Sequence, residues 1–398
     1  MKVPFSPPDV SEREIELVAE TMRSGWITTG PRTKQFEALL ADFCGTEEVA
    51  CLSSATAAME LTLRGLGIGE GDEVITSAYT YTASASVIAH VGAKIVLVDT
   101  APGSYFMDND KITAAITQRT KAIIPVDVAG VPADYDGIKA ALDSRSASFR
   151  PNSELQEALG RVAIVGDAAH SLGAIYKRIP AALASDFCCF SFHAVKNLTT
   201  AEGGAVAFDD IGDVSAAEIY KRYMLASLHG QSKDALAKAQ IGAWEYDILA
   251  PAYKFNMTDI TAAMGIGQLE RYPALLARRY EMVKRYNERL SGSRARSLVH
   301  SGDGWVGSHH LYMVDIEGAN ASERDEIINR MAARGISCNV HYKPLPMMTA
   351  YRRLGLHEAD FPNAVDMFTR EITLPLHTLL TDEQIDYVAS EFIAASAR

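Results

Sequence analysis

Short apolar runs alternate with helix-length stretches over the first two-thirds of the chain. The apolar runs predict strands at 48–54, 73–77, 94–99, 121–127, 162–167, 187–192 and 205–208. Several of these runs are apolar almost throughout, which is typical of strands that are covered on both faces. Helices are predicted between the earlier strands, at 56–66, 83–91 and 135–142. This alternation indicates an α/β fold with a doubly wound, mostly parallel central sheet and helices on both faces.

The pattern changes in the second half of the chain. Helical periodicity dominates from 213 to about 293. In the last hundred residues the pattern predicts a strand at 310–316, a helix at 324–334 and a second strand at 337–341. A polar, serine-rich stretch at 144–153 is interpreted as a surface loop. We therefore expect a large domain over 1–250, followed over 251–398 by linking helices and a smaller α/β domain.

Composition and charge narrow the class of protein. The 398 residues are 48% hydrophobic and 22% charged, as in ordinary globular proteins. The net charge of −12 disfavours binding to nucleic acid or to an anionic membrane. The stretch 74–93 has the length of a membrane span, but eight hydroxyl residues between Thr76 and Ser86 make its transfer into lipid unfavourable. Because the first residues lack the apolar run of a secretory signal, we expect a cytoplasmic protein.

The cysteines and histidines give no sign of a metal centre. Five scattered cysteines without a secretion signal indicate a reducing compartment, and the adjacent Cys188 and Cys189 are interpreted as buried apolar residues. No acidic or cysteine ligands surround the pair His309 and His310, so we predict no metal. Glycines at alternate positions over 65–71 do not match G-x-G-x-x-G in either alignment, which disfavours a nicotinamide oxidoreductase.

Three groups of residues follow predicted strands, at the edge where open α/β sheets bind ligands. The first is the run of small residues at 53–58, which includes Ser54, Ala55 and Thr56. Backbone amides of small residues before a helix bind anions well, although the same residues also fit an ordinary helix cap. This group is a candidate phosphate site.

The other two groups contain Asp167 and Lys196. Asp167 ends an apolar strand, where its carboxylate is costly to bury without a cation such as a pyridinium nitrogen, unless it is only a helix cap or a surface residue. The strand at 187–192 contains Ser191, and the segment that begins with this strand ends at Lys196. A lysine beside an aldehyde forms a Schiff base and then acts as a base, whereas a lone loop lysine is usually a solvated cation. Together, the lysine, the aspartate and a phosphate site are what pyridoxal phosphate requires.

These motifs resemble those of the DegT/StrS-type family, the pyridoxal-phosphate-dependent nucleotide-sugar aminotransferases with the aspartate aminotransferase (type I) fold. The similarity runs over nearly the whole chain, in SGWITTGP, SSATAAM, GDAAHS, SFHAVKN, YKFNMTDITAAMG and VHYKP. Within the family, the chain is most similar to the UDP-4-amino-4-deoxy-L-arabinose–oxoglutarate aminotransferases and to the aminotransferase of pseudaminic acid synthesis.

The resemblance implies a role for each matching residue. The catalytic residues would be Lys196, Asp167 and His170. The cofactor would also contact Ser54, Ala55, Thr56, Tyr81, Ser191 and, from the second subunit of a homodimer, Asn256. The sugar nucleotide would contact Trp26, Thr28, Thr29, Lys254, His310, His341 and Tyr342.

The resemblance also implies a reaction. An amino group would pass by a ping-pong mechanism from L-glutamate to a nucleotide-linked keto-sugar, expected to be a UDP-4-keto-sugar. The product would serve bacterial surface polysaccharide or lipopolysaccharide. Two alternatives remain, a sugar dehydratase of the same family and a relative without catalytic activity. Lys196 argues against those dehydratases that carry histidine in its place, and the set of Asp167, His170, Lys196 and Asn256 argues against an inactive relative.

Overall fold

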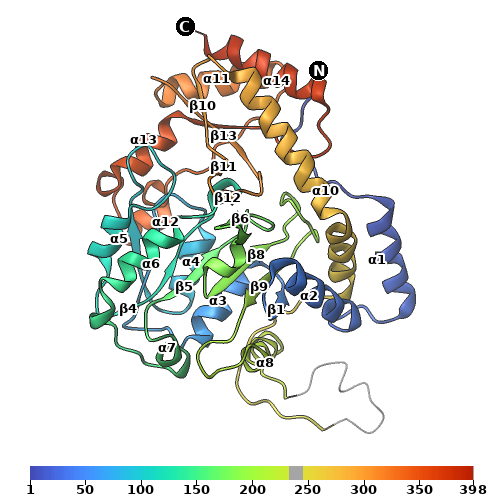
Figure 1. Ribbon diagram of the computed structural model, residues 1–398, viewed down its shortest axis with the longest axis vertical. Helices are drawn as coiled ribbons and strands as arrows, with labels where there is room; N and C mark the ends of the chain where they lie inside the picture. Colours follow the sequence, from blue (N-terminus) through green and yellow to red (C-terminus); the bar gives the residue numbers. More distant parts are fainter. Residues whose placement is uncertain (233–244, 398) are drawn as a thin grey trace.

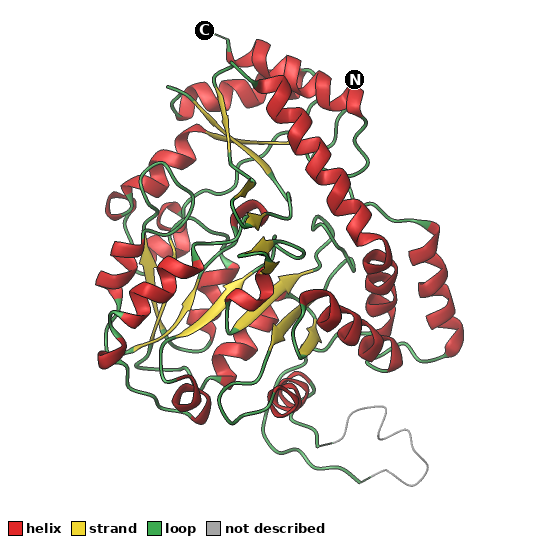
Figure 2. Ribbon diagram, viewed as in Figure 1, coloured by secondary structure: helices red, strands yellow, loops and turns green. Residues whose placement is uncertain are grey.

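The structure is a computed structural model that describes residues 1–232 and 245–397, and a large mixed sheet lies at its centre (Figures 1 and 2). The strands of this seven-stranded sheet are, in spatial order, β1 (Glu48–Leu52), β9 (Gly204–Phe208), β8 (Phe187–Ser191), β5 (Ala163–Asp167), β4 (Thr120–Ile124), β2 (Glu73–Ser77) and β3 (Lys94–Val98). From β8 to β3 all neighbours pair in parallel, and β9 is antiparallel to both β8 and β1. The predicted α/β class with a mostly parallel sheet is confirmed.

Helices cover both faces of this sheet (Figure 2). The helices of the described residues are α1 (Glu12–Ser24), α2 (Pro31–Cys44), α3 (Ala55–Gly65), α4 (Ala83–His90), α5 (Asn109–Ala115), α6 (Tyr135–Asp143), α7 (Glu154–Leu159), α8 (Ala216–Ser227), α10 (Asp259–Leu290), α11 (Ala321–Ala333), α12 (Thr349–Arg353), α13 (Pro362–Arg370) and α14 (Asp382–Ser396). Short 3-10 helices span Val128–Gly130, Ser146–Ser148, Ala181–Ala184, Leu345–Met347 and Glu358–Asp360.

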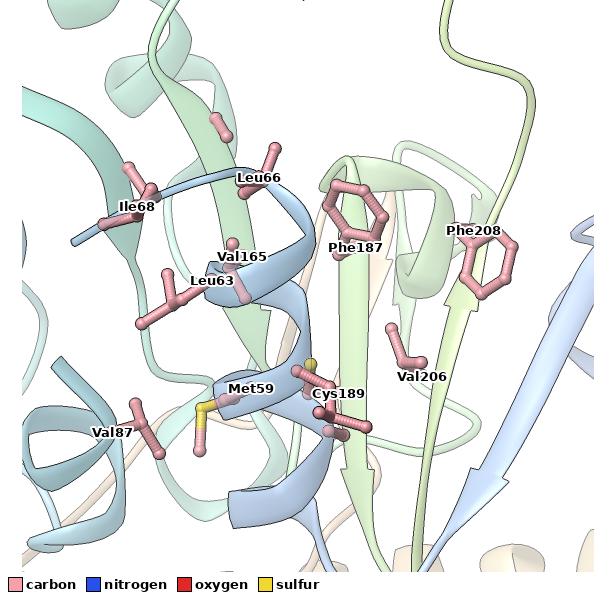
Figure 3. Packing of buried hydrophobic residues seen from close by; sticks show 14 of the residues in the cluster. Met59, Leu63, Leu66, Ile68, Val87, Val165, Phe187, Cys189, Val206 and Phe208 are labelled. Carbon is pink, nitrogen blue, oxygen red and sulfur yellow. The ribbon is translucent and has the colours of Figure 1, made fainter. Parts of the chain in front are cut away.

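The alternation of side chains along β8 explains why its sequence is apolar throughout. Phe187 and Cys189 pack into the cluster that contains α3 (Figure 3), whereas Cys188 and Phe190 pack on the opposite face, with residues of α2 and α10. Successive residues of a strand point to opposite faces, so a strand covered on both sides needs apolar residues at every position. Both cysteines are free and buried, as predicted.

The start of α3 lies close to the large sheet because residue 204 is a glycine. Ser54 caps the helix, since its hydroxyl accepts a hydrogen bond of 3.0 Å from the amide of Ala57. A Cβ at Gly204 would lie 2.2 Å from the carbonyl carbon of Ser54 and 2.4 Å from the amide nitrogen of Ala55. The first turn of α3 is therefore held against β9 at the carboxyl end of β1.

Two smaller sheets complete the fold. One contains, in order, β10 (Ala295–Ser297), β13 (Tyr312–Ile316) and β14 (Glu371–Leu374), all antiparallel, with a core shared by α10, α11 and α14. Val3, from the N-terminal end, is buried in the same core. The other sheet is formed by the short strands β11 (Ser301–Gly302), β12 (Trp305–Val306), β6 (Ile175–Tyr176) and β7 (Ile179–Pro180).

The predicted strand at 337–341 is wrong. Within that stretch only Asn339 forms a β-bridge, to Thr373, with backbone hydrogen bonds of 3.0 and 2.8 Å. The chain then leaves the sheet edge, and Tyr342 contacts His170, which follows β5 of the large sheet. The regular strand in this region is β14, which the sequence analysis did not predict.

The helical pattern that dominates the prediction from 213 to about 293 is interrupted in the structure. Helices α8 and α10 account for its two ends, but 228–232 and 245–258 are not helical. These two stretches pair instead through antiparallel bridges, such as Leu228 with Lys254. Residues 233–244 lie outside the described part of the chain.

The stretch at 74–93 forms β2, a turn and α4. Val74, Val87 and Ile88 are fully buried in the apolar cluster that contains α3. Over residues 1–232 and 245–397, no helix is both long enough and apolar enough to cross a bilayer.

Gly204→Ala should destabilise the protein. The new methyl group would meet backbone atoms that cannot rotate away, and overpacking of this kind costs about 1–3 kcal/mol or more. Urea unfolding of the cofactor-free protein measures the loss. Gly65→Ala, at the other end of α3, is the matched control, because a Cβ there meets open space. Equal stability of the two variants would contradict the close approach of α3 to β9.

Candidate active site

A cavity of about 350 Å³ lies at the carboxyl ends of β1, β5 and β8. Nine of the residues singled out in the sequence line it, namely Ser54, Ala55, Thr56, Tyr81, Asp167, His170, Ser191, Lys196 and Tyr342. They come from segments that are far apart in the chain and meet only in the folded structure.

Asp167 ends β5 and brings a buried carboxylate to the wall of the cavity, where the residue is only 6% exposed. Its Oδ2 accepts a hydrogen bond of 2.6 Å from the Ser84 hydroxyl, and its Oδ1 accepts one of 3.2 Å from the Ala169 amide. Burial raises the pKa of Asp167, and these hydrogen bonds and the charge of Lys196 oppose that rise. A buried carboxylate is costly without a cation, so this position favours a positively charged ligand group.

Lys196 lies in the loop between β8 and β9. The loop is closed at its base by a hydrogen bond of 2.9 Å from the amide of Thr200 to the carbonyl of Phe192. Burial lowers the pKa of Lys196 to about 8, and the charge of Asp167 opposes this shift. A lysine with this pKa holds a share of neutral amine near neutral pH, so it can act as a nucleophile and as a base.

The start of α3 forms another part of the wall. The hydroxyl of Ser54 pairs with the amide of Ala57, while the amides of Ala55 and Thr56 come before the first hydrogen bond of the helix. Ser191 adds a hydroxyl from the end of β8. Backbone amides at a helix N-terminus, with the positive end of the helix dipole, favour a phosphate group.

The neutral side chain of His170 and the side chain of Tyr342 line the same cavity as the charged groups of Asp167 and Lys196. The hydroxyl of Tyr342 is 3.0 Å from Nε2 of His170, and burial lowers the pKa of His170 well below its usual range. Nδ1 of His170 is buried and has no hydrogen-bond partner among the described residues. His310 packs behind His170, with ring centroids 4.4 Å apart, and His341 bonds to Thr373. Neither of these two is among the residues that line the cavity.

The other predicted residues form a separate group in this chain. Trp26 donates a hydrogen bond of 3.1 Å to the carbonyl of Thr29, and Asn256 donates one of 2.7 Å to the Thr29 hydroxyl. Lys254 bonds to the side-chain oxygen of Asn256, and Thr28 precedes Thr29 in the chain. None of the five is among the residues that line the cavity. Their predicted roles, like those of the cavity residues, stay predictions.

The model of the DegT/DnrJ/EryC1/StrS aminotransferase family matches residues 8–393. The chain belongs to this family. The resemblance that the motifs carry is thereby confirmed.

Solved structures agree with this assignment to the aminotransferase family. Spr1654 from Streptococcus pneumoniae, described as a sugar aminotransferase, is 51% identical in its PMP form, with a TM-score of 0.97 and 99% of both chains covered. Its PLP form has a TM-score of 0.96 at 49% identity, with 100% of this chain and 99% of that chain covered. PseC from Helicobacter pylori, an aminotransferase of pseudaminic acid biosynthesis, has a TM-score of 0.86 at 25% identity, with 99% of both chains covered.

A curated relative links the aminotransferase family to polysaccharides. The spore coat polysaccharide biosynthesis protein SpsC from Bacillus subtilis is 35% identical over 390 residues, which is 97% of this chain and 95% of SpsC. Together with the PLP and PMP forms of Spr1654, these matches identify an aminotransferase that uses pyridoxal phosphate.

The cavity of this aminotransferase fits pyridoxal phosphate. Asp167 has a buried negative charge for the ring nitrogen, the start of α3 has amides for the phosphate, and Lys196 has an amine for the aldehyde. The unpartnered Nδ1 of His170 can meet a polar group of the ring. A volume of about 350 Å³ is within the usual range of small-molecule sites.

Ser84 was not among the predicted site residues, although its hydroxyl holds the carboxylate of Asp167. Ser84 is fully buried in α4, and its hydroxyl is 2.8 Å from that of Thr80. The signal was present in the run of hydroxyl residues after the strand at 73–77. Nothing in that run distinguished Ser84 from Ser86, because only the packing of α4 decides which hydroxyl faces β5.

Ser84→Ala should weaken the binding of pyridoxal phosphate. Loss of the donor to Oδ2 raises the pKa of Asp167 further and reduces the negative charge available to the ring nitrogen. A hydrogen bond to a buried charge contributes about 1.5–3 kcal/mol, so Kd should rise about 10- to 100-fold in an absorbance titration of the cofactor-free protein. Ser86→Ala, in the same helix, is the control, because within the described part of the chain the Ser86 hydroxyl bonds only to the carbonyl of Ala83. Equal Kd values for the two variants would overturn this role.

The reaction of the cofactor-free aminotransferase with pyridoxal phosphate should depend on pH through Lys196. The neutral amine is the reactive form, so the rate should fall about tenfold per unit below pH 8 and level off above it. Stopped-flow absorbance from pH 6 to 10 measures this profile. A midpoint near 10.4, the value of an exposed lysine, would show that the site does not lower the pKa of Lys196.

Proposed function

We propose that the protein transfers an amino group from an amino acid, expected to be L-glutamate, to the keto carbon of a nucleotide-linked sugar, expected to be a UDP-4-keto-sugar. The observation that carries the proposal is that Lys196, the buried Asp167 and the open start of α3 meet in one cavity. The names of Spr1654 and PseC support a sugar as the acceptor. The name of SpsC supports a product for a polysaccharide. We propose that the product serves surface polysaccharide or lipopolysaccharide and is made in the cytoplasm.

Each residue of the cavity has a separate role in the proposed reaction. Bound pyridoxal phosphate supplies an electron sink for the bonds broken at the α-carbon of the amino acid. Lys196 would hold the cofactor through Nζ and, with Nζ free, would move a proton from the α-carbon of the amino acid, a role that contributes about 10²–10⁴-fold to the rate. Asp167 would favour a positive charge on the ring nitrogen, and His170 would bind a polar group of the ring. Tyr81, which lines the cavity, would contact the ring.

The overall reaction exchanges two groups. The amino acid gives up its amino group and α-hydrogen and becomes a 2-oxo acid. The keto-sugar loses its carbonyl oxygen as water, gains the nitrogen and one hydrogen at that carbon, and becomes an amino sugar. The oxygen of the 2-oxo acid comes from water, so one water is consumed and one is released. Because one substrate loses what the other gains, no external oxidant or reductant is needed.

A second copy of the chain is part of the proposal. Asn256, with Trp26, Thr28, Thr29 and Lys254, would reach the cavity of the partner, because in its own chain this group lies outside the cavity lining. Tyr81 lines the cavity and is 62% exposed, and Ile248 and Leu249, near Lys254, are 48% and 61% exposed. A second subunit would cover these apolar surfaces.

The test is to incubate the loaded enzyme with L-glutamate and a panel of nucleotide-linked keto-sugars. We expect equal amounts of 2-oxoglutarate and of an amino sugar, detected by mass spectrometry. Lys196→Ala should lower the rate by at least about 10²-fold. Lys221→Ala, which removes a lysine exposed on α8, should not change it.

Two results would contradict the proposal. Release of a deoxy-sugar without 2-oxoglutarate would indicate the dehydratase alternative. Full transfer by Lys196→Ala would remove that residue from the chemistry.

A further inference from the structure

The segment that enters β13 crosses the carboxyl ends of three neighbouring strands of the large sheet. The amide of Ser308 donates a hydrogen bond of 2.8 Å to the carbonyl of Gly130, which follows β4. The hydroxyl of Ser308 bonds to the carbonyl of His170, which follows β5. The carbonyl of Ser308 accepts a hydrogen bond of 2.8 Å from the side chain of Asn197, which follows β8. The segment therefore ties together the loops that hold His170 and Lys196.

Glycine makes this close approach possible. A Cβ at Gly130 would lie 2.2 Å from the Ser308 hydroxyl and 2.8 Å from the carbonyl of His170. The positive φ of Gly130, 87°, is also strained for other residues. The contact is built into the backbone at this point and does not depend on long, adjustable side chains.

Asn197 uses both ends of its amide on this segment. Nδ2 donates to the carbonyl of Ser308, so Oδ1 must accept the hydrogen bond of 2.9 Å from Nδ1 of His310. Nδ1 of His310 therefore carries a proton, and burial lowers the pKa of His310 well below the usual range, which favours the neutral ring. Its ring packs against that of His170. Asn197 is buried, so losing these bonds leaves polar groups without partners.

We propose that Asn197 and His310 are positioning residues for Lys196, an inference that rests on the proposed role of Lys196 in holding the cofactor. Asn197 follows Lys196 directly, so its two hydrogen bonds fix the backbone from which the long lysine side chain extends. His310 supplies one of these bonds. Neither side chain lines the cavity, so both act through other residues.

The experiment separates the lysine from the rest of the site with two ligands. Pyridoxal phosphate reacts with Lys196, whose neutral amine adds to the aldehyde with loss of one water. Pyridoxamine phosphate has no aldehyde and reports only on the other contacts. For cofactor-free wild type, Asn197→Ala, His310→Ala and the double variant, we would measure the rate of pyridoxal phosphate capture by absorbance and the Kd of pyridoxamine phosphate by calorimetry.

We expect both single variants to capture pyridoxal phosphate at least about tenfold more slowly, with Kd for pyridoxamine phosphate changed less than about threefold. The double variant should be no slower than the slower single variant, because both changes break the same contact. His310→Asn, whose amide can donate in place of Nδ1, should restore most of the rate and tests the idea even if Asn197→Ala folds poorly.

The matched control is Asn363→Ala. The Asn363 side chain, on α13, donates a hydrogen bond to the backbone carbonyl of Thr100, which follows β3 of the large sheet. Like Asn197 it joins two segments through a backbone carbonyl, but it is far from Lys196 in the chain. Its capture rate should equal that of wild type. Unchanged capture by Asn197→Ala and His310→Ala would overturn the inference, as would parallel losses of capture and of pyridoxamine phosphate binding. If wild type captures no better than Lys196→Ala, the proposed function itself fails.

Discussion

The carboxylate of Asp167 is the constraint around which the site is organised. It sits at the end of β5, nearly inaccessible to water, with one hydroxyl and one amide as hydrogen-bond donors. Two such bonds do not replace the hydration of a buried anion, so burial raises the pKa of Asp167. A nearby cation would stabilise the ionised carboxylate. Lys196 provides part of that charge, but its own burial lowers its pKa. The carboxylate of Asp167 is stabilised most when a ligand adds a further positive charge to that of Lys196.

The sheet explains why these groups meet. Strands β1, β5 and β8 run in the same direction, so the residues that follow them gather at one edge. The antiparallel β9 returns the chain from the Lys196 loop and, through Gly204, brings the start of α3 to the same place. The segment Ser308–His310, which leads into β13, then contacts the loops that follow β4, β5 and β8. The cavity residues and the packing of this segment on the large sheet therefore share one set of contacts.

Much of this could be predicted from the sequence, for identifiable reasons. Strands covered on both faces show as apolar runs, as in β8, and residues that follow parallel strands must share an edge, which brought Asp167, Lys196 and Ser54 together. Other features depend on distant packing. The strand predicted at 337–341 failed because Tyr342 leaves the sheet for His170, and β14 was missed. Neither the choice of Ser84 within its run of hydroxyl residues nor the pairing of Asn197 with His310 could be predicted locally, since the partners lie 83 and 113 residues away.

The most direct test of the central claim is the protonation state of the cofactor nitrogen that would face Asp167. Loading the enzyme with pyridoxal phosphate labelled with ¹⁵N in the ring, and recording the nitrogen chemical shift by NMR, reports this state without turnover. The account predicts a protonated ring nitrogen in wild type and an unprotonated one in Asp167→Asn at the same pH. An unprotonated nitrogen in wild type, or the same shift in both proteins, would contradict it.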